Sequence, residues 1–403
     1  MDLPKTRVVI VGAGQAGARA AEALRAAGHC GSITLLGEEG HLPYERPQLS
    51  KSVLLDAEPK PAFIRTSKDW ADLDITLSTS SRVVAADVDR RQIGLADGRE
   101  LTFDQLLIAT GTRARRLPEL EQASLPVRYL RCMNDALALR RDLEPGKKIV
   151  LVGGGVIGLE VASAAVARGC SVVILEKADT LLPQIGSPAL SRYAHDLHVV
   201  KGVKIVCGAS IKRPTADGIE LDDGRRFPAD LVLAGVGVEP SAELARQLGL
   251  PIAQGIKVTA TGATALDGIY AAGDVAEQWS RCHDRWMRVE NWANAQNQAI
   301  STARNMAGES ALYEAAPWFW SDQYDANIQI VGHPAAGEEI VRGDISGGRF
   351  TTISIRDGEA VGGVTVNSAR DMSVLRRLIA SRKPVRRSDL ENPAFELKRS
   401  LAS

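Results

Sequence analysis

Cysteine is scarce in this chain of 403 residues, and its five copies are scattered. They are Cys30, Cys132, Cys170, Cys207 and Cys282, and no two of them stand in C-x-x-C or C-x-x-x-x-C spacing. This pattern argues against a disulfide framework, a zinc site and a Cys-ligated iron–sulfur cluster. We therefore expect reduced thiols, as in a cytoplasmic protein, and no metal site.

The chain also lacks a net charge and a long apolar run, and we expect no leader. Lys+Arg and Asp+Glu number 49 each, so no general attraction to nucleic acid or to an anionic membrane is expected. No apolar run reaches the roughly 18 residues that a membrane span needs. The first residues run straight into an apolar strand, so no signal peptide is expected. With 45% apolar and 24% charged residues, the composition is that of a soluble globular protein of two or three domains.

A glycine-rich segment near the start of the chain lies between an apolar strand and a helix. The strand at 7–11 leads into G-A-G-Q-A-G at 12–17, and an Ala-rich helix follows over about 16–27. A second strand at 32–36 ends beside Glu38. This order of elements is a βαβ unit with a G-x-G-x-x-G loop, which is typical of dinucleotide binding.

The same pattern returns in the second quarter of the chain. A strand at 148–152 leads into G-G-G-V-I-G at 153–158, a helix runs to about residue 168, and a strand at 171–175 ends at Glu176. The apolar segments at 106–111 and 231–237 are also similar to each other, because both end in small residues. The repeat predicts two similar dinucleotide-binding domains.

Each glycine of such a loop has its own physical reason. The first makes the tight turn, the second lets the backbone approach a pyrophosphate, and the third allows close helix–strand packing. The helix N-terminus favours the phosphate charge, and the acid that ends the second strand accepts hydrogen bonds from ribose hydroxyls. A carboxylate at Glu176 favours the free 2′-OH of NADH over the 2′-phosphate of NADPH, a preference that Lys177 softens.

The last part of the chain differs in character from the two repeats. Segments 350–355 and 360–366 read as antiparallel strands, a helix is expected over about 369–381, and residues 384–403 form a further helix or a loose tail. The predicted fold class is therefore α/β, with two Rossmann-like dinucleotide-binding domains plus a C-terminal α+β domain.

Four further stretches connect the chain to a known family. The segment P-Y-E-R-P-Q-L-S-K at 43–51 is similar to a stretch of the NADH–ferredoxin reductases that serve bacterial Rieske-type ring-hydroxylating dioxygenases and cytochrome P450 systems. Y-A-A-G-D-V at 270–275, E-N-W-A-N-A-Q-N-Q at 290–298 and P-W-F-W-S-D-Q at 317–323 resemble flavin-binding stretches of that family. The resemblance places the chain among the glutathione-reductase-like flavoproteins. The chain lacks the redox-active cysteines of the disulfide reductases and peroxidases, and Gln48 stands where many relatives have a proline.

The resemblance implies an enzyme with FAD and NADH as cofactors and a definite layout. Residues 1–113 and 244–318 form a discontinuous FAD-binding domain, 114–243 the NADH-binding domain and 319–403 the C-terminal domain. The residues implied for FAD are Gly12, Gly14, Gly17, Glu38, Arg46, Lys51, Ala109, Thr110, Gly111, Gly273, Asp274, Trp292 and Trp320. Those implied for NADH are Gly153, Gly155, Gly158, Glu160, Glu176 and Gly237.

Lys51 and Glu160 are implied as a catalytic pair beside the flavin N5. Glu160 also suits the first turn of its helix, where an acid complements the helix dipole. The helix that opens after Trp292 is expected to aim its positive end at the flavin, and Trp292 and Trp320 either wall the flavin or belong to the core.

Electrons from NADH enter the flavin as a pair and leave one at a time, and without a thiol relay they must pass to an outside acceptor. By resemblance this acceptor is a small acidic [2Fe–2S] ferredoxin, and the protein itself is a monomer or homodimer. Six cations without an intervening acid form either its docking surface or a solvated helix face and tail. They are Arg376, Arg377, Arg382, Lys383, Arg386 and Arg387.

Other functions fit the same fold. One is an NADH–rubredoxin reductase or an NADH oxidase, although the 43–51 stretch and the absence of a site cysteine argue against the oxidase. Another is an NADH-sensing flavoprotein that resembles apoptosis-inducing factor, in which turnover is incidental. Neutral net charge and the lack of long inserted segments argue against this last function.

Overall fold

The computed structural model describes residues 5–122, 124–280 and 284–401. Cys282 lies outside these residues, and Cys30, Cys170 and Cys207 form no disulfide. The chain divides into two compact units. The first unit comprises Met1–Arg46, Pro61–Arg113 and Val238–Ala315, and the second comprises Pro47–Lys60, Ala114–Gly237 and Ala316–Ser403.

A five-stranded parallel sheet forms the centre of the first unit, in the order β19-β7-β1-β2-β3. All four residues of β1 are buried, as expected for a strand covered on both faces. The five strands are β1 (Val8–Val11), β2 (Ile33–Leu36), β3 (Ile75–Ser78), β7 (Gln105–Ile108) and β19 (Ile269–Ala271).

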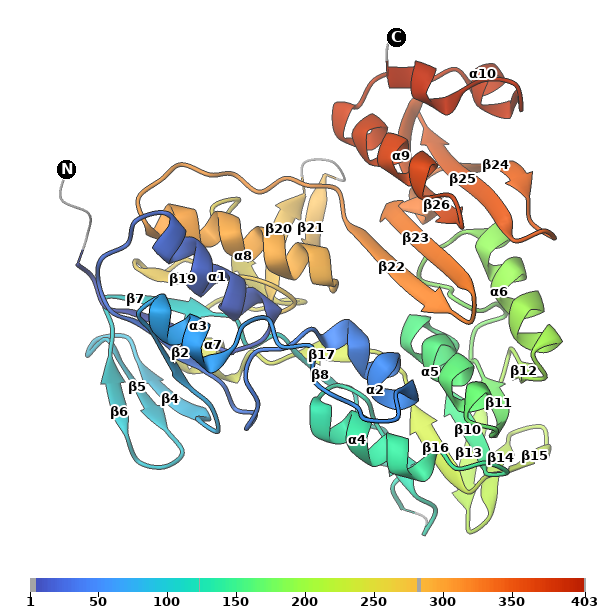
Figure 1. Ribbon diagram of the computed structural model, residues 1–403, viewed down its shortest axis with the longest axis horizontal. Coiled ribbons are helices and arrows are strands. Elements are labelled where there is room, and N and C mark those ends of the chain that lie inside the picture. The colour runs from blue at the N-terminus through green and yellow to red at the C-terminus, as the bar shows by residue number, and fades with distance from the viewer. Residues whose placement is uncertain (1–4, 123, 281–283, 402–403) are drawn as a thin grey trace. The chain divides into compact units, whose positions relative to one another are not determined.

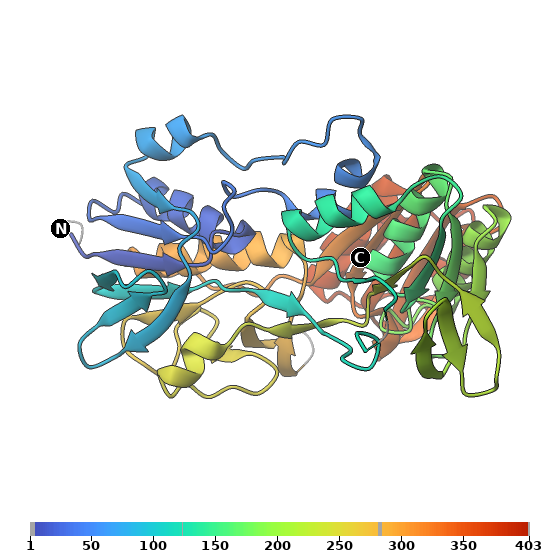
Figure 2. The ribbon, with the colours of Figure 1, turned by 90° about the horizontal axis from the view of Figure 1, so that it is seen from below.

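Helices α1 (Gln15–Ala26) and α8 (Trp292–Met306) lie side by side on one face of this sheet (Figures 1 and 2). Val8 and Ile10 of β1 share a buried cluster with both helices, whereas Val9 and Val11 belong to the cluster on the opposite face. The period of two along a strand explains this division. Small alanines on α1, which are fully buried, let the two helices approach closely.

Smaller elements complete the first unit. Antiparallel sheets are formed by β4 (Val83–Asp87), β5 (Gln92–Leu95) and β6 (Glu100–Thr102), and by β20 (Ala276–Ser280) and β21 (Arg285–Arg288), with β18 (Ile256–Val258) parallel to β20. The strand β8 (Thr112–Ala114) pairs with β17 (Val238–Pro240). The remaining helices are α3 (Ser67–Asp72) and α7 (Glu243–Gln247).

The second unit repeats the parallel design, with the order β12-β11-β10-β16-β9. Its strands are β9 (Val127–Arg128), β10 (Lys148–Val152), β11 (Ser171–Leu175), β12 (Lys204–Val206) and β16 (Leu231–Ala234). The antiparallel strands β13 (Ile211–Thr215), β14 (Gly218–Leu221) and β15 (Arg226–Pro228) form a smaller sheet. The helices are α2 (Ser52–Leu55), α4 (Met133–Asp142), α5 (Val156–Ala167) and α6 (Pro188–Val200), and the 3-10 turn η1 (Arg46–Ser50) precedes α2.

The C-terminal part of the second unit is an antiparallel sheet covered by a helix. The sheet runs β22-β23-β26-β25-β24, and Leu375 and Leu378 of α9 pack in its buried cluster. The predicted strands at 350–355 and 360–366 and the helix at 369–381 are confirmed, and the predicted tail contains two short helices. The elements are β22 (Trp318–Gln323), β23 (Ala326–Gly332), η2 (Pro334–Ala336), β24 (Glu338–Asp344), β25 (Arg349–Arg356), β26 (Glu359–Val366), α9 (Ala369–Ser381), α10 (Arg387–Glu391) and η3 (Leu397–Leu401).

Candidate functional site

The first glycine loop connects β1 to α1, and its three glycines meet different surroundings. Gly12 has φ +111°, and a Cβ there would lie 2.3 Å from the Ala109 carbonyl oxygen. A Cβ on Gly17 would lie 1.9 Å from the Gly12 carbonyl oxygen, so this glycine lets α1 approach the strand. A Cβ on Gly14 would meet only Arg46 Nε, at 3.9 Å. The space in front of Gly14 therefore fits a pyrophosphate, with a guanidinium beside it.

The N-termini of α1 and α8 lie together at Gly273. A Cβ on Gly273 would lie 2.8 Å from Ala16 Cβ of α1 and 3.8 Å from Ala295 Cβ of α8. In addition, Gln15 Nε2 donates to Gln296 Oε1 at 3.2 Å. Two helix N-termini at one place favour an anionic ligand. The expected helix is confirmed, but it begins at Trp292 itself.

The strand ends beside this loop hold the other residues implied for FAD. Thr110 Oγ1 donates to the Ser241 carbonyl at 2.6 Å, and the Ser241 N–H donates to the Gly111 carbonyl at 2.9 Å. Gly111 has φ +65°, a conformation that favours glycine. Asp274 follows Gly273, and its carboxylate accepts a long hydrogen bond of 3.5 Å from Thr112 Oγ1.

Arg46 is held in place by Glu39, a carboxylate that the sequence did not single out. Its Nη2 donates to Glu39 Oε1 at 2.6 Å, and the Tyr44 hydroxyl donates to Glu39 Oε2 at 2.6 Å. The neighbouring Glu45 lies 3.5 Å from Arg19 Nη2 of α1 and accepts from Trp292 Nε1 of α8.

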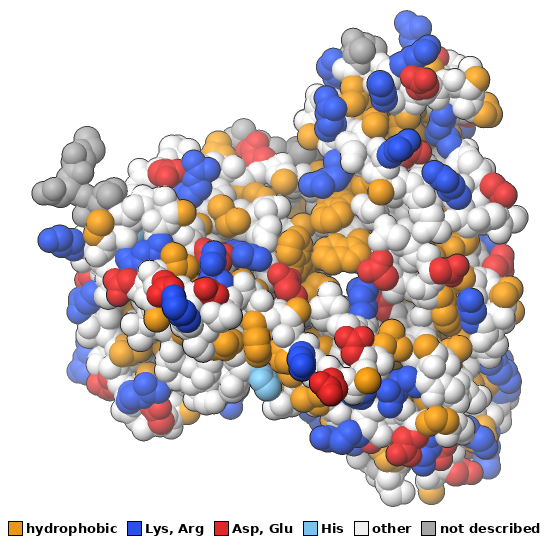
Figure 3. Space-filling model, in the orientation of Figure 1, with side chains coloured by type: hydrophobic (Ala, Val, Ile, Leu, Met, Phe, Trp, Pro, Cys, Tyr) orange, Lys and Arg blue, Asp and Glu red, His pale blue; other side chains and the backbone are white. Residues whose placement is uncertain are grey.

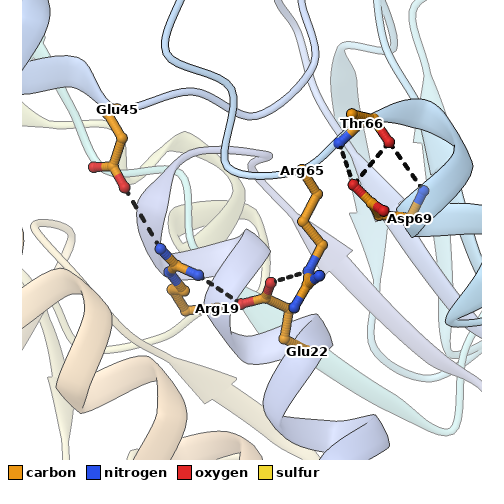
Figure 4. A network of polar contacts seen from close by, with 6 residues as sticks. All are labelled: Arg19, Glu22, Glu45, Arg65, Thr66 and Asp69. Carbon is orange, nitrogen blue, oxygen red and sulfur yellow. Dashed lines mark hydrogen bonds and ion pairs between the residues drawn. The ribbon is translucent and has the colours of Figure 1, made fainter.

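Figure 4 shows how Arg19 extends this network to Glu22, which also pairs with Arg65. The loop that carries Arg46 is therefore connected to α1 and α8. The predicted ribose ligand Glu38 is exposed, and Arg82 Nε lies 3.5 Å from it. Its acidic neighbour Glu39, by contrast, is already engaged with Arg46. The paired acids after β2 are the sequence signal that would have included Glu39.

The second glycine loop, between β10 and α5, has the same design. Gly153 has φ +104°, and a Cβ there would lie 2.5 Å from the Gly235 carbonyl oxygen. A Cβ on Gly158 would lie 2.5 Å from the Gly153 carbonyl oxygen, whereas a Cβ on Gly155 would meet only Gln184 Nε2, at 3.4 Å. Gly237, with φ +97°, faces open space. This loop also fits a dinucleotide.

Glu176 lies at the end of β11, where its buried carboxylate shapes the loop. Its Oε2 accepts from the Gly154 N–H at 2.6 Å, and its Oε1 accepts from the Ala178 N–H at 2.7 Å. Each carboxylate oxygen has a second lone pair for a ribose hydroxyl. The sequence predicted that Glu176 binds NADH, but it did not predict the hydrogen bond from the Gly154 N–H.

Lys51 and Glu160 form the ion pair that the resemblance implies, with Lys51 Nζ 2.8 Å from Glu160 Oε1. The Glu160 carboxylate is 5% exposed and also accepts from Ser50 Oγ at 2.5 Å and Ser321 Oγ at 2.8 Å. The expected place of Glu160 in the first helical turn is wrong. Because α5 begins at Val156, Glu160 lies in the second turn and is stabilised by these three donors.

An aromatic pair lies next to Lys51. Lys51 Nζ is 6.0 Å from the centroid of the Trp320 ring, which stacks on Trp318 with centroids 5.6 Å apart and an interplanar angle of 26°. The Arg376 guanidinium lies 4.7 Å from the Trp318 ring centroid. Both tryptophans are half-buried, and Trp318 packs against the buried cluster of the C-terminal sheet.

The six predicted surface cations lie on and after α9, where Figure 3 shows Lys and Arg side chains gathered at the upper right. Acids outside the run of cations reach two of them. Arg382 pairs with Glu359 at 3.1 Å, and Arg387 pairs with Glu338 and Glu391. Arg377 and Arg386 are exposed. The positive charge of this surface is therefore smaller than the sequence suggests.

The described residues contain no cluster of three or more His, Cys, Asp or Glu side chains placed to hold a metal. Within the same residues, no helix has the length and apolar character to cross a membrane.

Comparison with known proteins identifies the class. A family model described as pyridine nucleotide-disulphide oxidoreductase matches residues 6–299, and one described as reductase C-terminal matches residues 318–401. The chain belongs to the pyridine nucleotide-disulphide oxidoreductase family.

Two of the relatives are ferredoxin–NAD(+) reductase components of dioxygenase systems. The chain is 44% identical to the ferredoxin–NAD(+) reductase component of the p-cumate 2,3-dioxygenase system of Pseudomonas putida, over 98% of both chains. It is 40% identical to the corresponding component of the anthranilate 1,2-dioxygenase system of Burkholderia cepacia, over 97% of this chain and 98% of that one. The reductase in a covalent putidaredoxin reductase–putidaredoxin complex has a TM-score of 0.95 at 36% identity, with 98% of each chain covered.

These findings confirm the predicted resemblance, the fold class and the use of FAD and NAD(H). They do not test the individual site residues or the domain boundaries, which stay predictions.

Proposed function

We propose that this protein is an FAD-dependent reductase that passes electrons from NADH, one at a time, to a [2Fe–2S] ferredoxin that supplies an oxygenase. The observation that carries the proposal is the pair of glycine loops, each with one open glycine, in a chain without a redox-active cysteine pair. Relatives that span the whole chain are reductase components of dioxygenase systems. Bound FAD would accept an electron pair and release single electrons.

The residues of the first unit would bind FAD. The pyrophosphate would lie in front of Gly14, close to Arg46 Nε and to the N-termini of α1 and α8. Asp274 would bind the ribityl chain. Residues 1–113 and 244–318 would form this domain.

The second unit would bind NADH at its own open glycine. Gly155 would face the pyrophosphate, and Glu176 would accept hydrogen bonds from the ribose hydroxyls, since its carboxylate is already fixed by two backbone N–H groups. A 2′-phosphate would bring negative charge against this buried carboxylate, so NADH is preferred over NADPH. Residues 114–243 would form this domain, and 319–403 the third.

Lys51 would lie beside the flavin, and Glu160 would hold its ammonium group. An ion pair with one member 5% exposed and the other 16% exposed is screened little by solvent. Its geometry is therefore fixed before a ligand arrives, and alignment is what the transfer from NADH to flavin requires.

A small acidic ferredoxin would approach the cations around α9. Weak redox complexes use such surfaces for electrostatic steering, which shows in the association rate and its salt dependence. The exposed pair Arg377 and Arg386 would contribute most, because Arg382 and Arg387 already pair with acids. Docking of the ferredoxin is separate from reduction of the flavin by NADH.

A carrier panel tests the proposed function. The FAD-loaded protein would be assayed with NADH and an excess of a [2Fe–2S] ferredoxin, rubredoxin, oxygen or ferricyanide. The proposal predicts that the ferredoxin turns over fastest of the three biological acceptors, and that Arg377→Glu with Arg386→Glu slows this acceptor alone. Faster rubredoxin or oxygen turnover would instead identify a rubredoxin reductase or an oxidase, and uniformly slow electron release would identify a sensor.

A further inference from the structure

A hydrogen-bonded chain of side chains runs through the interior of the second unit, from Glu160 to His198. Ser321 Oγ donates to Glu160 Oε1 at 2.8 Å, and Gln323 Nε2 lies 3.1 Å from Ser321 Oγ. His198 Nε2 lies 3.1 Å from Gln323 Oε1, and the Tyr324 hydroxyl lies 3.2 Å from His198 Nδ1. Ser321, Gln323 and His198 are at most 1% exposed, so solvent does not share these bonds.

The residues of this hydrogen-bonded network belong to three separate elements of secondary structure. Glu160 belongs to α5 and His198 to α6, whereas Ser321 and Gln323 alternate on β22 and therefore point to one face of that strand. Tyr324 follows the strand at φ +54°, and its N–H donates to Ser163 Oγ of α5 at 2.8 Å. The end of β22 is thus attached to α5 one turn beyond Glu160.

The direction of every bond follows from the Glu160 carboxylate. A carboxylate paired with Lys51 only accepts, so the Ser321 hydroxyl must give its hydrogen to Glu160. Ser321 Oγ then accepts from the Gln323 amide group, which turns Gln323 Oε1 toward His198. His198 therefore carries its hydrogen on Nε2.

The histidine end of the chain keeps one protonation state. Burial lowers the pKa of His198 from 6.5 to about 4, and burial raises the pKa of Tyr324 to about 12. His198 is thus a neutral ring whose Nδ1 accepts from the Tyr324 hydroxyl. Charged groups lie at both ends of the hydrogen-bonded network: Glu160 and Lys51 at one end, and Lys201, whose Nζ lies 5.3 Å from the Tyr324 ring centroid, at the other.

We propose that His198 and Gln323 are positioning residues for the Lys51–Glu160 pair. They orient the Ser321 hydroxyl, this hydroxyl and that of Ser50 hold the Glu160 carboxylate, and the carboxylate holds Lys51 Nζ. Apolar side chains of similar size would fill the same interior without the need to satisfy every polar atom, so packing alone does not account for the chain. The inference rests on the proposed function, in which Lys51 and Glu160 lie beside FAD and the nicotinamide.

The donor and acceptor roles in this hydrogen-bonded network can be measured without enzymatic turnover. Nitrogen-15 NMR of the imidazole groups, recorded on the FAD-loaded protein, reports which ring nitrogen carries hydrogen, and His198→Gln assigns the resonance by its loss. We expect a neutral ring protonated on Nε2 from roughly pH 6 to pH 9. A ring protonated on Nδ1, or a cationic ring at roughly pH 6, would overturn the proposed direction.

A matched pair of variants tests the consequence for the reaction. His198→Phe keeps a ring but removes the donor to Gln323, whereas His198→Gln restores an N–H near the position of Nε2. In anaerobic stopped-flow reduction by NADH, we expect His198→Phe to lower the limiting rate roughly tenfold with little change in NADH affinity. We expect His198→Gln to recover most of the rate. Gln323→Met is the second probe if His198→Phe does not fold, and it should show the same loss.

Two further measurements separate the outcomes. If thermal stability falls in His198→Phe and Gln323→Met while the limiting rate and the flavin reduction potential stay unchanged, the chain only supports the fold and the inference is wrong. Glu160→Gln serves as the reference for the pair itself. If Glu160→Gln also leaves the rate unchanged, the site in the proposed function is wrong. If Glu160→Gln alone slows reduction, only the positioning role fails.

Discussion

Gly14 and Gly17 stand three residues apart in one loop, and the structure predicts opposite consequences for the same substitution. The substitutions Gly14→Ala and Gly17→Ala each add a single methyl group to the backbone. The Gly17 methyl would lie 1.9 Å from the Gly12 carbonyl oxygen and 3.2 Å from Ile10 Cγ2. The Gly14 methyl would meet only Arg46 Nε, at 3.9 Å, and Gly14 has φ −85°, which alanine adopts without strain.

For Gly17→Ala, two terms of opposite sign decide the result. An alanine inside a helix gains about 0.5–1 kcal/mol over glycine. Overpacking of this kind costs about 1–3 kcal/mol, and the upper end applies because the opposing atom is backbone and cannot rotate away. We expect the apoprotein to lose about 2 kcal/mol of stability, or roughly 4 °C or more in melting temperature, and to bind FAD poorly.

For Gly14→Ala, we expect an apoprotein within about 0.5 kcal/mol of the parent and at least a roughly tenfold loss of FAD affinity, because the methyl enters the pyrophosphate position. Circular dichroism melting of both apoproteins and titration with FAD would measure the two effects. Equal melting temperatures for Gly17→Ala and the parent, or unchanged FAD affinity in Gly14→Ala, would refute the reasoning.

Three other outcomes follow from the same structure. Glu176→Ala should raise KM for NADH and narrow the preference over NADPH, and an unchanged ratio of kcat/KM for the two cofactors would refute the ribose assignment. Arg377→Glu combined with Arg386→Glu should slow ferredoxin reduction several-fold at low salt, with ferricyanide reduction intact; equal ferredoxin rates would show a solvated surface. Burial lowers the pKa of His198 from 6.5 to about 4, so the buried ring costs no stability above pH 6.5, and stability is lost as the pH falls from 6.5 to 4, where the unfolded chain takes up a proton that the folded ring does not. The unfolding free energy should therefore drop by about 3 kcal/mol more in the parent than in His198→Gln between roughly pH 7 and pH 4; parallel pH profiles would contradict the buried neutral ring.

The repeated strand–loop–helix order was predictable because it depends on local chemistry. Each glycine of a G-x-G-x-x-G loop has a separate steric reason, and those reasons appear in the contacts of Gly12 and Gly17. The apolar strands and the helix over 369–381 likewise follow from short-range patterns. The Lys51–Glu160 pairing came from resemblance, and nothing in the spacing of the two residues implies it.

The remaining features depend on distant parts of the chain. Ser321, Gln323 and His198 are ordinary polar residues in the sequence, and only the packing of β22 against α5 and α6 makes them neighbours of Glu160. No acid lies between the surface cations in the sequence. Their partners Glu338 and Glu359 lie on strands of the sheet that are distant in sequence. Glu160 was placed one helical turn too early because the sequence does not mark the first residue of α5.

A double-mixing stopped-flow experiment tests the central claim most directly. The FAD-loaded protein would first be mixed with one equivalent of NADH without oxygen, and then with an excess of oxidised [2Fe–2S] ferredoxin. The account predicts fast loss of the flavin absorbance at the first mixing and fast reduction of two ferredoxins per NADH at the second. Fast flavin reduction followed by slow electron release to the ferredoxin would contradict it.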